Sequence, residues 1–282
     1  MIEVKDLTYR YAGSRRKVFD GFSMAFAENK IYGLLGKNGT GKSTLLYLIS
    51  GLLRPEGGSI RFDGMETSRR LPDFLKEVFL VPEEYDLPNL SLKEHVRMMA
   101  AFYPRFSEEV LRQCLRDFEM EEEPDLKALS MGQKKKVYMS MALAAGTRLL
   151  LMDEPTNGLD IPSKSLFRKV VANNMADDRT LIISTHQVHD VESLLDHILI
   201  LDEQRLLLDS SVADLTARYW FGYLSPSETD SRVLYAEPTL QGNASMRLRE
   251  TSEVETPLNL ELLFNAVTKG IGNENNTKKG GE

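Results

Sequence analysis

One glycine-rich segment, GKNGTGKS at positions 36–43, constrains the fold of this chain more than any other feature. It matches the pattern G-x-x-x-x-G-K-[ST] at every fixed position. The apolar run 31–35 before it is typical of a buried strand, and residues 44–50 after it are typical of a helix that Gly51 ends. Glycine has no Cβ, so backbone N–H groups can approach phosphate oxygens, and the helix N-terminus adds the positive end of its dipole. Strand, loop and helix in this order predict a nucleotide phosphate site.

Two side chains of this segment have specific expected roles. Lys42 is placed to reach the β- and γ-phosphates, and the Ser43 hydroxyl is placed to bind Mg²⁺. The alternative is a glycine-rich turn that arose by chance. The residues expected to contact the nucleotide here are Gly36, Lys37, Asn38, Gly39, Thr40, Gly41, Lys42, Ser43 and Thr44.

Composition narrows the class of protein. The chain of 282 residues has 35 basic and 42 acidic side chains, a net charge of −7, which argues against nucleic acid as the main partner. It contains no apolar run of about 18 residues, so no membrane span is expected. From its first residues we expect no secretory signal, and its single cysteine, Cys114, rules out an internal disulfide. We expect a cytoplasmic protein in which Cys114 is a small core residue.

The order of elements predicts an α/β fold. Residues 1–35 alternate in the manner of strands, which suggests an antiparallel β part before the phosphate loop. From residue 149 onward, apolar strands alternate with segments of helical pattern, including one at 190–195, as in a parallel sheet covered on both faces. Residues 90–128 look wholly helical, so we expect a helical insertion at about 84–145 within an α/β domain of residues 1–222.

The C-terminal part has a weaker pattern. Short strands are expected at 233–235 and 246–248, and an amphipathic helix at 258–267. We interpret residues 223–268 as a small accessory segment. Residues 269–282, rich in Gly, Asn and Lys, are expected to be disordered.

A second candidate site lies where the apolar strand 149–152 ends in two acids, Asp153 and Glu154. An acid at the tip of such a strand, beside a phosphate loop, can hold Mg²⁺ directly or through water. Asp153 fits that role. Glu154 points elsewhere and could polarise the attacking water. The alternative is an acidic turn after a core strand.

A third candidate lies at the start of a predicted helix, where Ser130 and Gln133 form a capping-box pattern. The functional interpretation is that this helix N-terminus, with its serine hydroxyl, faces a second phosphate group. The three lysines at 134–136 that follow are interpreted as a solvated face of the helix rather than an anion site.

These motifs together resemble the ATP-binding cassette (ABC) family, the nucleotide-binding subunits of ABC transporters, over residues 2–219. The core implied is that of a P-loop NTPase. Lys42 and Ser43 match the Walker A residues, and Asp153 and Glu154 match the Walker B aspartate and the catalytic glutamate. Residues 129–133 match the signature LSGGQ, which implies nucleotide contacts from Ser130, Gly132 and Gln133.

Three further positions follow the same resemblance. Asp160, in the sequence GLD, matches the D-loop, and His186 matches the switch histidine that assists catalysis. Tyr11 matches the aromatic residue that stacks on adenine. The competing interpretations are a capping or surface histidine for His186 and an ordinary strand tyrosine for Tyr11.

Two positions depart from the family pattern. Met131 replaces the middle glycine of the signature, where a bulky side chain could hinder approach to the opposing phosphate. Glu83 replaces the glutamine of the Q-loop. A carboxylate can still meet Mg²⁺ or its water, but it adds negative charge near the γ-phosphate. Both changes bear on the rate of hydrolysis more than on nucleotide binding.

The resemblance implies a dimer that encloses two ATP molecules with Mg²⁺ and opens after hydrolysis. One cassette per chain requires a second copy or a paralogue, and transport requires a transmembrane permease subunit that holds the chain on the inner face of the membrane. The leading hypothesis is the ATPase subunit of an exporter. The alternatives are a soluble ABC-type ATPase acting on ribosomes or DNA, and a regulatory module without turnover. Cargo, transport direction and dimer type cannot be inferred from these residues.

A docking surface for the membrane partner is expected just after Glu83. The loop 84–90 carries Tyr85, Leu87 and Leu90, and the next helix presents apolar residues at helical spacing. The alternative is that these side chains pack the core of the helical insertion itself. The helix residues concerned are Val96, Met99, Ala100 and Tyr103.

Overall fold

The computed structural model describes residues 1–85, 90–225 and 230–271. The main helices are α1 (Lys42–Ile49), α2 (Pro72–Leu75), α3 (Leu92–Phe102), α4 (Glu108–Asp117), α5 (Met131–Ala144), α6 (Ile161–Asn173), α7 (Val212–Arg218) and α8 (Leu260–Thr268). The strands are β1 (Ile2–Tyr9), β2 (Phe19–Phe26), β3 (Ile31–Leu35), β4 (Gly57–Phe62), β5 (Met65–Glu66), β6 (Val78–Val81), β7 (Leu149–Asp153), β8 (Thr180–Thr185), β9 (His197–Asp202), β10 (Arg205–Ser211), β11 (Tyr219–Leu224), β12 (Val233–Thr239) and β13 (Gly242–Leu248).

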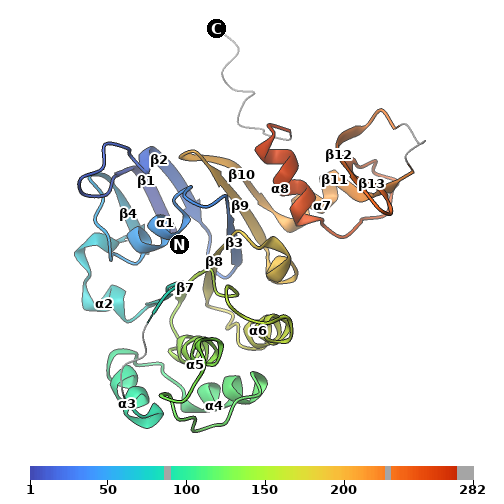
Figure 1. Ribbon diagram of the computed structural model, residues 1–282. Helices are drawn as coiled ribbons and strands as arrows, with labels where there is room; N and C mark the ends of the chain where they lie inside the picture. Colours follow the sequence, from blue (N-terminus) through green and yellow to red (C-terminus); the bar gives the residue numbers. More distant parts are fainter. Residues whose placement is uncertain (86–89, 226–229, 272–282) are drawn as a thin grey trace.

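A six-stranded sheet in the order β10-β9-β3-β8-β7-β6 forms the centre of the molecule (Figure 1). β9, β3, β8, β7 and β6 pair in parallel, and β10 joins the edge antiparallel to β9. The predicted mostly parallel sheet is therefore confirmed. The strands are short apolar runs because both faces of the sheet are covered, which removes the polar alternation of a half-exposed strand.

Alternate side chains of each strand enter two different cores. Leu35 packs with α5, α6 and α8 on one face, whereas Leu34 packs with α1 and the N-terminal strands on the other. The N-terminal strands form a separate antiparallel sheet, β2-β1-β4-β5, as expected. This arrangement holds α1, and with it the phosphate loop, between two sheets.

The helical residues at the bottom of Figure 1 have a small core of their own. Leu92 and Val96 of α3 pack with Leu111 and Leu115 of α4 and with the outer side of α5. The capping box that opens α3 at Ser91 is present. The prediction that residues 90–128 are wholly helical is wrong after Asp117. Glu119 takes a left-handed backbone (φ 56), and a run of acids then leads into Pro124, which cannot continue a helix.

The C-terminal residues form the three-stranded sheet β11-β13-β12 at the upper right of Figure 1. Helix α8 connects it to the main core, because Leu263 and Val267 are buried against the central sheet cluster. β11 crosses the expected boundary at residue 222. Of the tail predicted to be disordered, residues 272–282 lie outside the described residues.

The prediction of a helix at 190–195 is also wrong. The chain forms two short 3₁₀ turns there, Val188–Asp190 and Glu192–Leu194. Immediately afterwards Asp196 joins the sheet, with its N–H donating to the Ile31 carbonyl at 2.9 Å and its carboxylate accepting from the Ile31 N–H at 2.8 Å. None of the helices in the described residues is long and apolar enough to cross a bilayer.

Candidate functional site

The phosphate loop connects β3 to α1 and is held closed by its own lysine. Lys42 Nζ donates to the carbonyl oxygens of Gly36 at 2.8 Å and Lys37 at 3.2 Å. Gly41 has φ 102, and a Cβ there would lie 2.9 Å from the Val18 side chain. Burial lowers the pKa of Lys42, and the negative charges of Glu154, Asp153 and Glu83 oppose that shift. The loop thus holds a buried cation whose ion pair with Glu154 is long, 4.0 Å between Nζ and Oε1, which suits an additional anionic ligand.

Asp153, at the tip of β7, faces Ser43 at the start of α1. One carboxylate oxygen, Oδ1, accepts hydrogen bonds from Ser43 Oγ at 3.0 Å and from Ser184 Oγ. The other, Oδ2, is buried and has no hydrogen-bond partner in the described part of the chain. Burial raises the pKa of Asp153, while the two hydroxyl donors lower it.

This geometry fits Mg²⁺, which prefers oxygen ligands and commonly binds one or two protein groups together with phosphate and water. The Ser43 hydroxyl and the free Oδ2 of Asp153 offer such ligands. Among the described residues, no three His, Cys, Asp or Glu side chains are grouped to hold a metal by themselves. A metal here would therefore depend on phosphate oxygens and water.

Glu154 follows directly and is turned away from Asp153 by a left-handed backbone, φ 44. Its Oε2 accepts a hydrogen bond from Thr185 Oγ1 at 3.0 Å, and its Oε1 accepts one from the His186 N–H at 3.1 Å. Oε1 also lies 2.8 Å from His186 Nδ1 and 4.0 Å from Lys42 Nζ. A non-glycine residue in this backbone region is strained, and such strain is concentrated at functional sites.

Tyr11 lies at the edge of the same region. Its hydroxyl is 2.9 Å from Thr44 Oγ1 on α1, and its ring meets Tyr9 edge-on at 5.2 Å between centroids. The side chain remains 44% exposed. Tyr11 is thus fixed by its hydroxyl end beside the phosphate loop and leaves ring surface open to a ligand.

The signature residues form a second group. Ser130 and Gln133 make the capping box of α5, with Gln133 N–H donating to Ser130 Oγ at 3.3 Å and Ser130 N–H donating to Gln133 Oε1 at 2.9 Å. A Cβ on Gly132 would meet the Gly158 carbonyl at 3.7 Å. In the described residues, no hydrogen bond joins this group to the phosphate loop. The structure therefore does not bring the two predicted phosphate contacts together within one chain.

Asp160 caps α6 by accepting a hydrogen bond from the Ser163 N–H at 3.0 Å. Hydrogen bonds from Ser163 hold the pKa of Asp160 below its usual value. Glu83 accepts a hydrogen bond from Asn157 Nδ2 at 2.8 Å. Neither carboxylate is hydrogen-bonded to Ser43 or Asp153 within the described residues. The predicted metal role of Glu83 thus depends on water or on a change of side-chain position.

Comparison with known proteins identifies this constellation. The protein-family model described as "ABC transporter" matches residues 19–157. The lantibiotic transport ATP-binding protein SrtF of Streptococcus pyogenes is 30% identical over 74% of this chain and 90% of its own length. This chain belongs to the ABC transporter ATP-binding family. As a member of that family, it binds ATP and is an ATPase.

Two further similarities agree with this assignment. The methionine import ATP-binding protein MetN of Carboxydothermus hydrogenoformans is 30% identical to this ABC subunit over 78% of this chain and 69% of its own length. A solved structure described as the ATP binding subunit of an ABC transporter superposes with a TM-score of 0.68 at 27% identity. That match covers 76% of this chain and 91% of the other. The predicted P-loop NTPase core is therefore confirmed.

The expectation that the three lysines of α5 form a solvated face is wrong for Lys135. Lys135 is buried, with 5% of its surface exposed, and donates to the carbonyl oxygens of Glu154 and Asn157, each at 2.9 Å. A cation at a helix N-terminus opposes the helix dipole, so the lysine run there was an available signal of a specific contact.

The sequence reasoning also missed two hydroxyl donors beside His186. Ser184 donates to Asp153, and Thr185 donates to Glu154.

The expected docking residues largely pack within the chain. Tyr85 stacks on Tyr138 with ring centroids 4.3 Å apart, and burial raises the pKa of Tyr85. Val96 is buried in the helical core, and Tyr103 packs against Phe79 at 5.3 Å between centroids. These side chains follow the alternative interpretation, since they gain more by covering their own core than by facing solvent. Leu87 lies outside the described residues.

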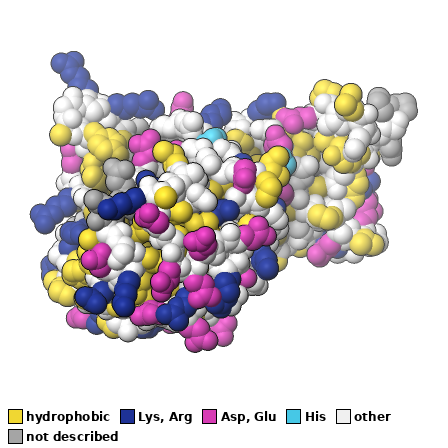
Figure 2. All heavy atoms as spheres, turned by 60° about the horizontal axis from the view of Figure 1, so that its bottom comes forward, with side chains coloured by type: hydrophobic (Ala, Val, Ile, Leu, Met, Phe, Trp, Pro, Cys, Tyr) yellow, Lys and Arg dark blue, Asp and Glu magenta, His cyan; other side chains and the backbone are white. Residues whose placement is uncertain are grey.

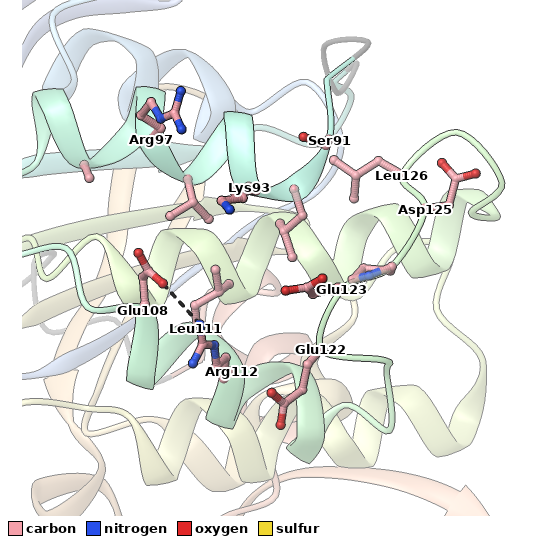
Figure 3. A pocket seen from close by; sticks show the side chains of 14 residues that line it. Ser91, Lys93, Arg97, Glu108, Leu111, Arg112, Glu122, Glu123, Asp125 and Leu126 are labelled. Carbon is pink, nitrogen blue, oxygen red and sulfur yellow. Dashed lines mark hydrogen bonds and ion pairs between the residues drawn. The ribbon is translucent and has the colours of Figure 1, made fainter.

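Two of the cavities in the described residues lie on the side of the helical insertion, away from the phosphate loop. One, of about 790 Å³, separates the signature group from the Q-loop position and is lined by Glu83, Glu84, Tyr85, Met131, Gly132, Lys134, Lys135, Asn157 and Gly158. The other, of about 770 Å³, lies between α3, α4 and residues 122–126 (Figure 3). The Glu108–Arg112 ion pair, 3.3 Å, runs along its wall. Basic and acidic side chains are interspersed over the face seen in Figure 2.

Proposed function

We propose that this ABC ATPase drives export through a separate transmembrane permease subunit, by ATP-dependent closure of a dimer. The observation that carries the catalytic part is the position of Glu154. Its Oε1 lies 4.0 Å from Lys42 Nζ and 2.8 Å from His186 Nδ1, beside the Asp153–Ser43 pair. A carboxylate held at the edge of a phosphate site is suited to accept a proton from an attacking water.

The roles of the side chains follow from their contacts. Lys42 and the N–H groups of residues 36–44 hold the β- and γ-phosphates, and the ring of Tyr11 stacks on the adenine. Mg²⁺, when bound at Ser43 and Asp153, supplies positive charge that offsets the charge on the phosphates. Glu154 accepts the proton of the attacking water. His186 fixes the Glu154 carboxylate in place and completes the catalytic pair.

The dimer proposal rests on the signature group. Ser130, Gly132 and Gln133 sit at the N-terminus of α5, an arrangement that binds phosphate, yet they make no hydrogen bond to this chain's own phosphate loop in the described residues. We propose that they and Asp160 meet the nucleotide held by a second ABC subunit. That subunit is either another copy of this chain or a paralogue.

Export is proposed from the relatives. The Nod factor export ATP-binding protein I of Cupriavidus pinatubonensis is 28% identical over 76% of this chain and 67% of its own length. Other relatives are named as import proteins, so the direction of transport is part of the proposal. We place the chain on the inner face of the cell membrane, held there by its permease partner. No role in nucleic-acid binding is proposed.

The domain organisation is proposed as follows. The catalytic domain takes in the helical insertion at about 84–145, and the accessory segment follows it up to residue 268. Because β11 begins at Tyr219, we set the end of the catalytic domain at Arg218 in place of residue 222. The accessory sheet is anchored to the catalytic domain through α8.

One set of strains tests this proposal. Wild-type cells are compared with cells carrying Glu154→Gln, a variant that keeps the shape of the side chain but replaces one acceptor oxygen with an NH2 group and cannot take up the proton. The purified variant should bind ATP and release phosphate at least about 100-fold more slowly. Spent media of the two strains are then compared by mass spectrometry. A compound that accumulates only in wild-type medium supports export, whereas one depleted only from wild-type medium contradicts it and indicates import.

A tagged wild-type chain, isolated from its own host in mild detergent, tests the partner. Co-purification of one integral membrane protein in a stoichiometric amount is the expected result. Recovery with ribosomes or DNA in place of such a protein would contradict the transport assignment and favour the soluble ATPase alternative.

A further inference from the structure

The middle lysine of α5 is a buried cation between the catalytic turn and the Q-loop position. Lys135 is 5% exposed, and its two hydrogen bonds go to backbone carbonyls of Glu154 and Asn157. A buried ammonium group is costly unless its donors are satisfied and opposite charges lie near. Its neighbour Lys136 is only half-buried and makes one long hydrogen bond, 3.4 Å, to the Phe118 carbonyl. The burial is therefore particular to Lys135.

The two carbonyls that Lys135 binds are the two ends of one tight turn. Residues 154–157 form it, and the Asn157 N–H donates to the Glu154 carbonyl at 3.1 Å. The Glu154 carbonyl thus accepts from both Lys135 and Asn157. Because Glu154 has a left-handed backbone, its conformation depends on the contacts that surround it. Lys135 is one of those contacts, and it comes from the signature helix.

The turn is also tied to the Q-loop position. Asn157 Nδ2 donates to Glu83 Oε1 at 2.8 Å, and Glu83, Lys135 and Asn157 line the same cavity of about 790 Å³. Burial lowers the pKa of Lys135, and the carboxylates of Glu83, Glu154 and Asp153 oppose that shift. The carboxylate at position 83 is therefore one of the negative charges that stabilise the buried ammonium group.

We propose that Lys135 is a positioning residue for Glu154, and that Glu83 acts on Glu154 through Asn157 and Lys135. A displacement of the Glu83 side chain changes the hydrogen bond at Asn157. It thereby changes how Lys135 holds the turn from which the Glu154 carboxylate projects. Lys135 touches no substrate. This inference rests on the proposed catalytic role of Glu154.

The first test is Lys135→Met, which fills the same space without donors or charge, measured in the full-length protein. We expect kcat for phosphate release to fall about tenfold or more while KM for ATP stays within about twofold, because the phosphates are held by the Lys42 loop. Lys135→Arg, which keeps charge and donors, should restore most of kcat. The matched control is Lys136→Met on the same helix, which should leave kcat within about twofold of wild type.

The second test is a double-mutant cycle of Glu83→Ala and Lys135→Met. If the loss of kcat in the double variant differs by about threefold or more from the product of the two single losses, the result supports coupling through Asn157. Multiplicative effects contradict it. If Lys135→Met does not fold, as judged by its melting temperature, Lys135→Gln is measured in its place.

Two outcomes separate this inference from the proposed function. Unchanged kcat in Lys135→Met, or an equal loss in Lys136→Met, overturns the role of Lys135 while leaving Glu154 as proposed. Normal turnover in Glu154→Gln, measured alongside, overturns the proposed function itself.

Discussion

Nδ1 of His186 lies 2.8 Å from Oε1 of Glu154, although the two residues are 32 positions apart in the chain. Adjacent parallel strands produce this contact, because Glu154 follows β7 and His186 follows β8. The carboxyl ends of such strands lie at one edge of a sheet, where ligands bind in open α/β folds. The imidazole and the His186 N–H together fix both the place and the orientation of the carboxylate.

His186→Ala should therefore impair chemistry more than binding. Without the imidazole, Glu154 keeps the hydrogen bonds from Thr185 and the His186 N–H but loses one contact that orients Oε1. We expect kcat to fall about 10- to 100-fold with little change in KM for ATP. The control is His189→Ala, since His189 is exposed and pairs with Glu261 outside the site. A kcat equal to that of the control would show that His186 has only a structural role at the end of β8 and does not assist Glu154.

Lys42→Ala should remove most of the affinity for ATP. Lys42 is the buried cation of the phosphate loop, and its ammonium group is held by the Gly36 and Lys37 carbonyls beside the expected phosphate position. Loss of a charge-assisted contact to phosphate should weaken binding about 100-fold. Binding of a fluorescent ATP analogue measures this, with Lys76→Ala as the control because Lys76 pairs with Asp73 on α2, outside the phosphate loop. Affinity within twofold of wild type would show that the loop does not hold phosphate in this way.

Met131→Gly should raise the ATPase rate. The Met131 side chain is 85% exposed at the N-terminus of α5. In the dimer proposed above, a second subunit's nucleotide would approach the signature group from this side. Removing the side chain clears that approach, at some cost in helix stability because glycine disfavours helices. Phosphate release at saturating ATP is compared with that of Met98→Gly, an exposed methionine of α3 away from the signature. An unchanged or lower rate would mean that the methionine is accommodated in the closed dimer.

Cys114 should be chemically silent in the folded protein. It lies on the buried face of α4, within the main core, and burial raises the pKa of its thiol to about 12. The reactive thiolate is therefore scarce at neutral and mildly alkaline pH, and its fraction grows only as the pH approaches that value. Titration with a disulfide reagent at pH 8 should label less than about one tenth of the native protein in an hour, and all of it in guanidinium chloride. Rapid labelling of the native chain would show that this part of the core opens.

Local pattern was sufficient for the parts of the site that lie on one segment. The sequence around Lys42 specifies strand, loop and helix together, because glycine, apolar run and helix start are all local properties. The same holds for the capping boxes at Ser91 and Ser130, which involve residues three positions apart. The alternation of apolar strands with helices also predicted the parallel sheet, since strands buried on both faces lose polar alternation.

Contacts between distant segments could not be read in that way. The sequence alone placed Glu154 and His186 after strands, but only the pairing of β7 with β8 decided that their side chains meet. The sequence left open whether Tyr85 and Tyr103 face a partner. In the structure the ring of Tyr85 packs against Tyr138 and the ring of Tyr103 packs against Phe79, so both pack within the chain. The sequence assigned Lys135 to the solvent, whereas the turn at Glu154 supplies two carbonyls that bury its ammonium group. Such burial depends on which acceptors and charges the fold brings within a few ångströms of the ammonium group. The free energy of a buried charge is set by these surroundings and not by its neighbours in the chain. The burial of Lys135 is therefore a property of the tertiary structure.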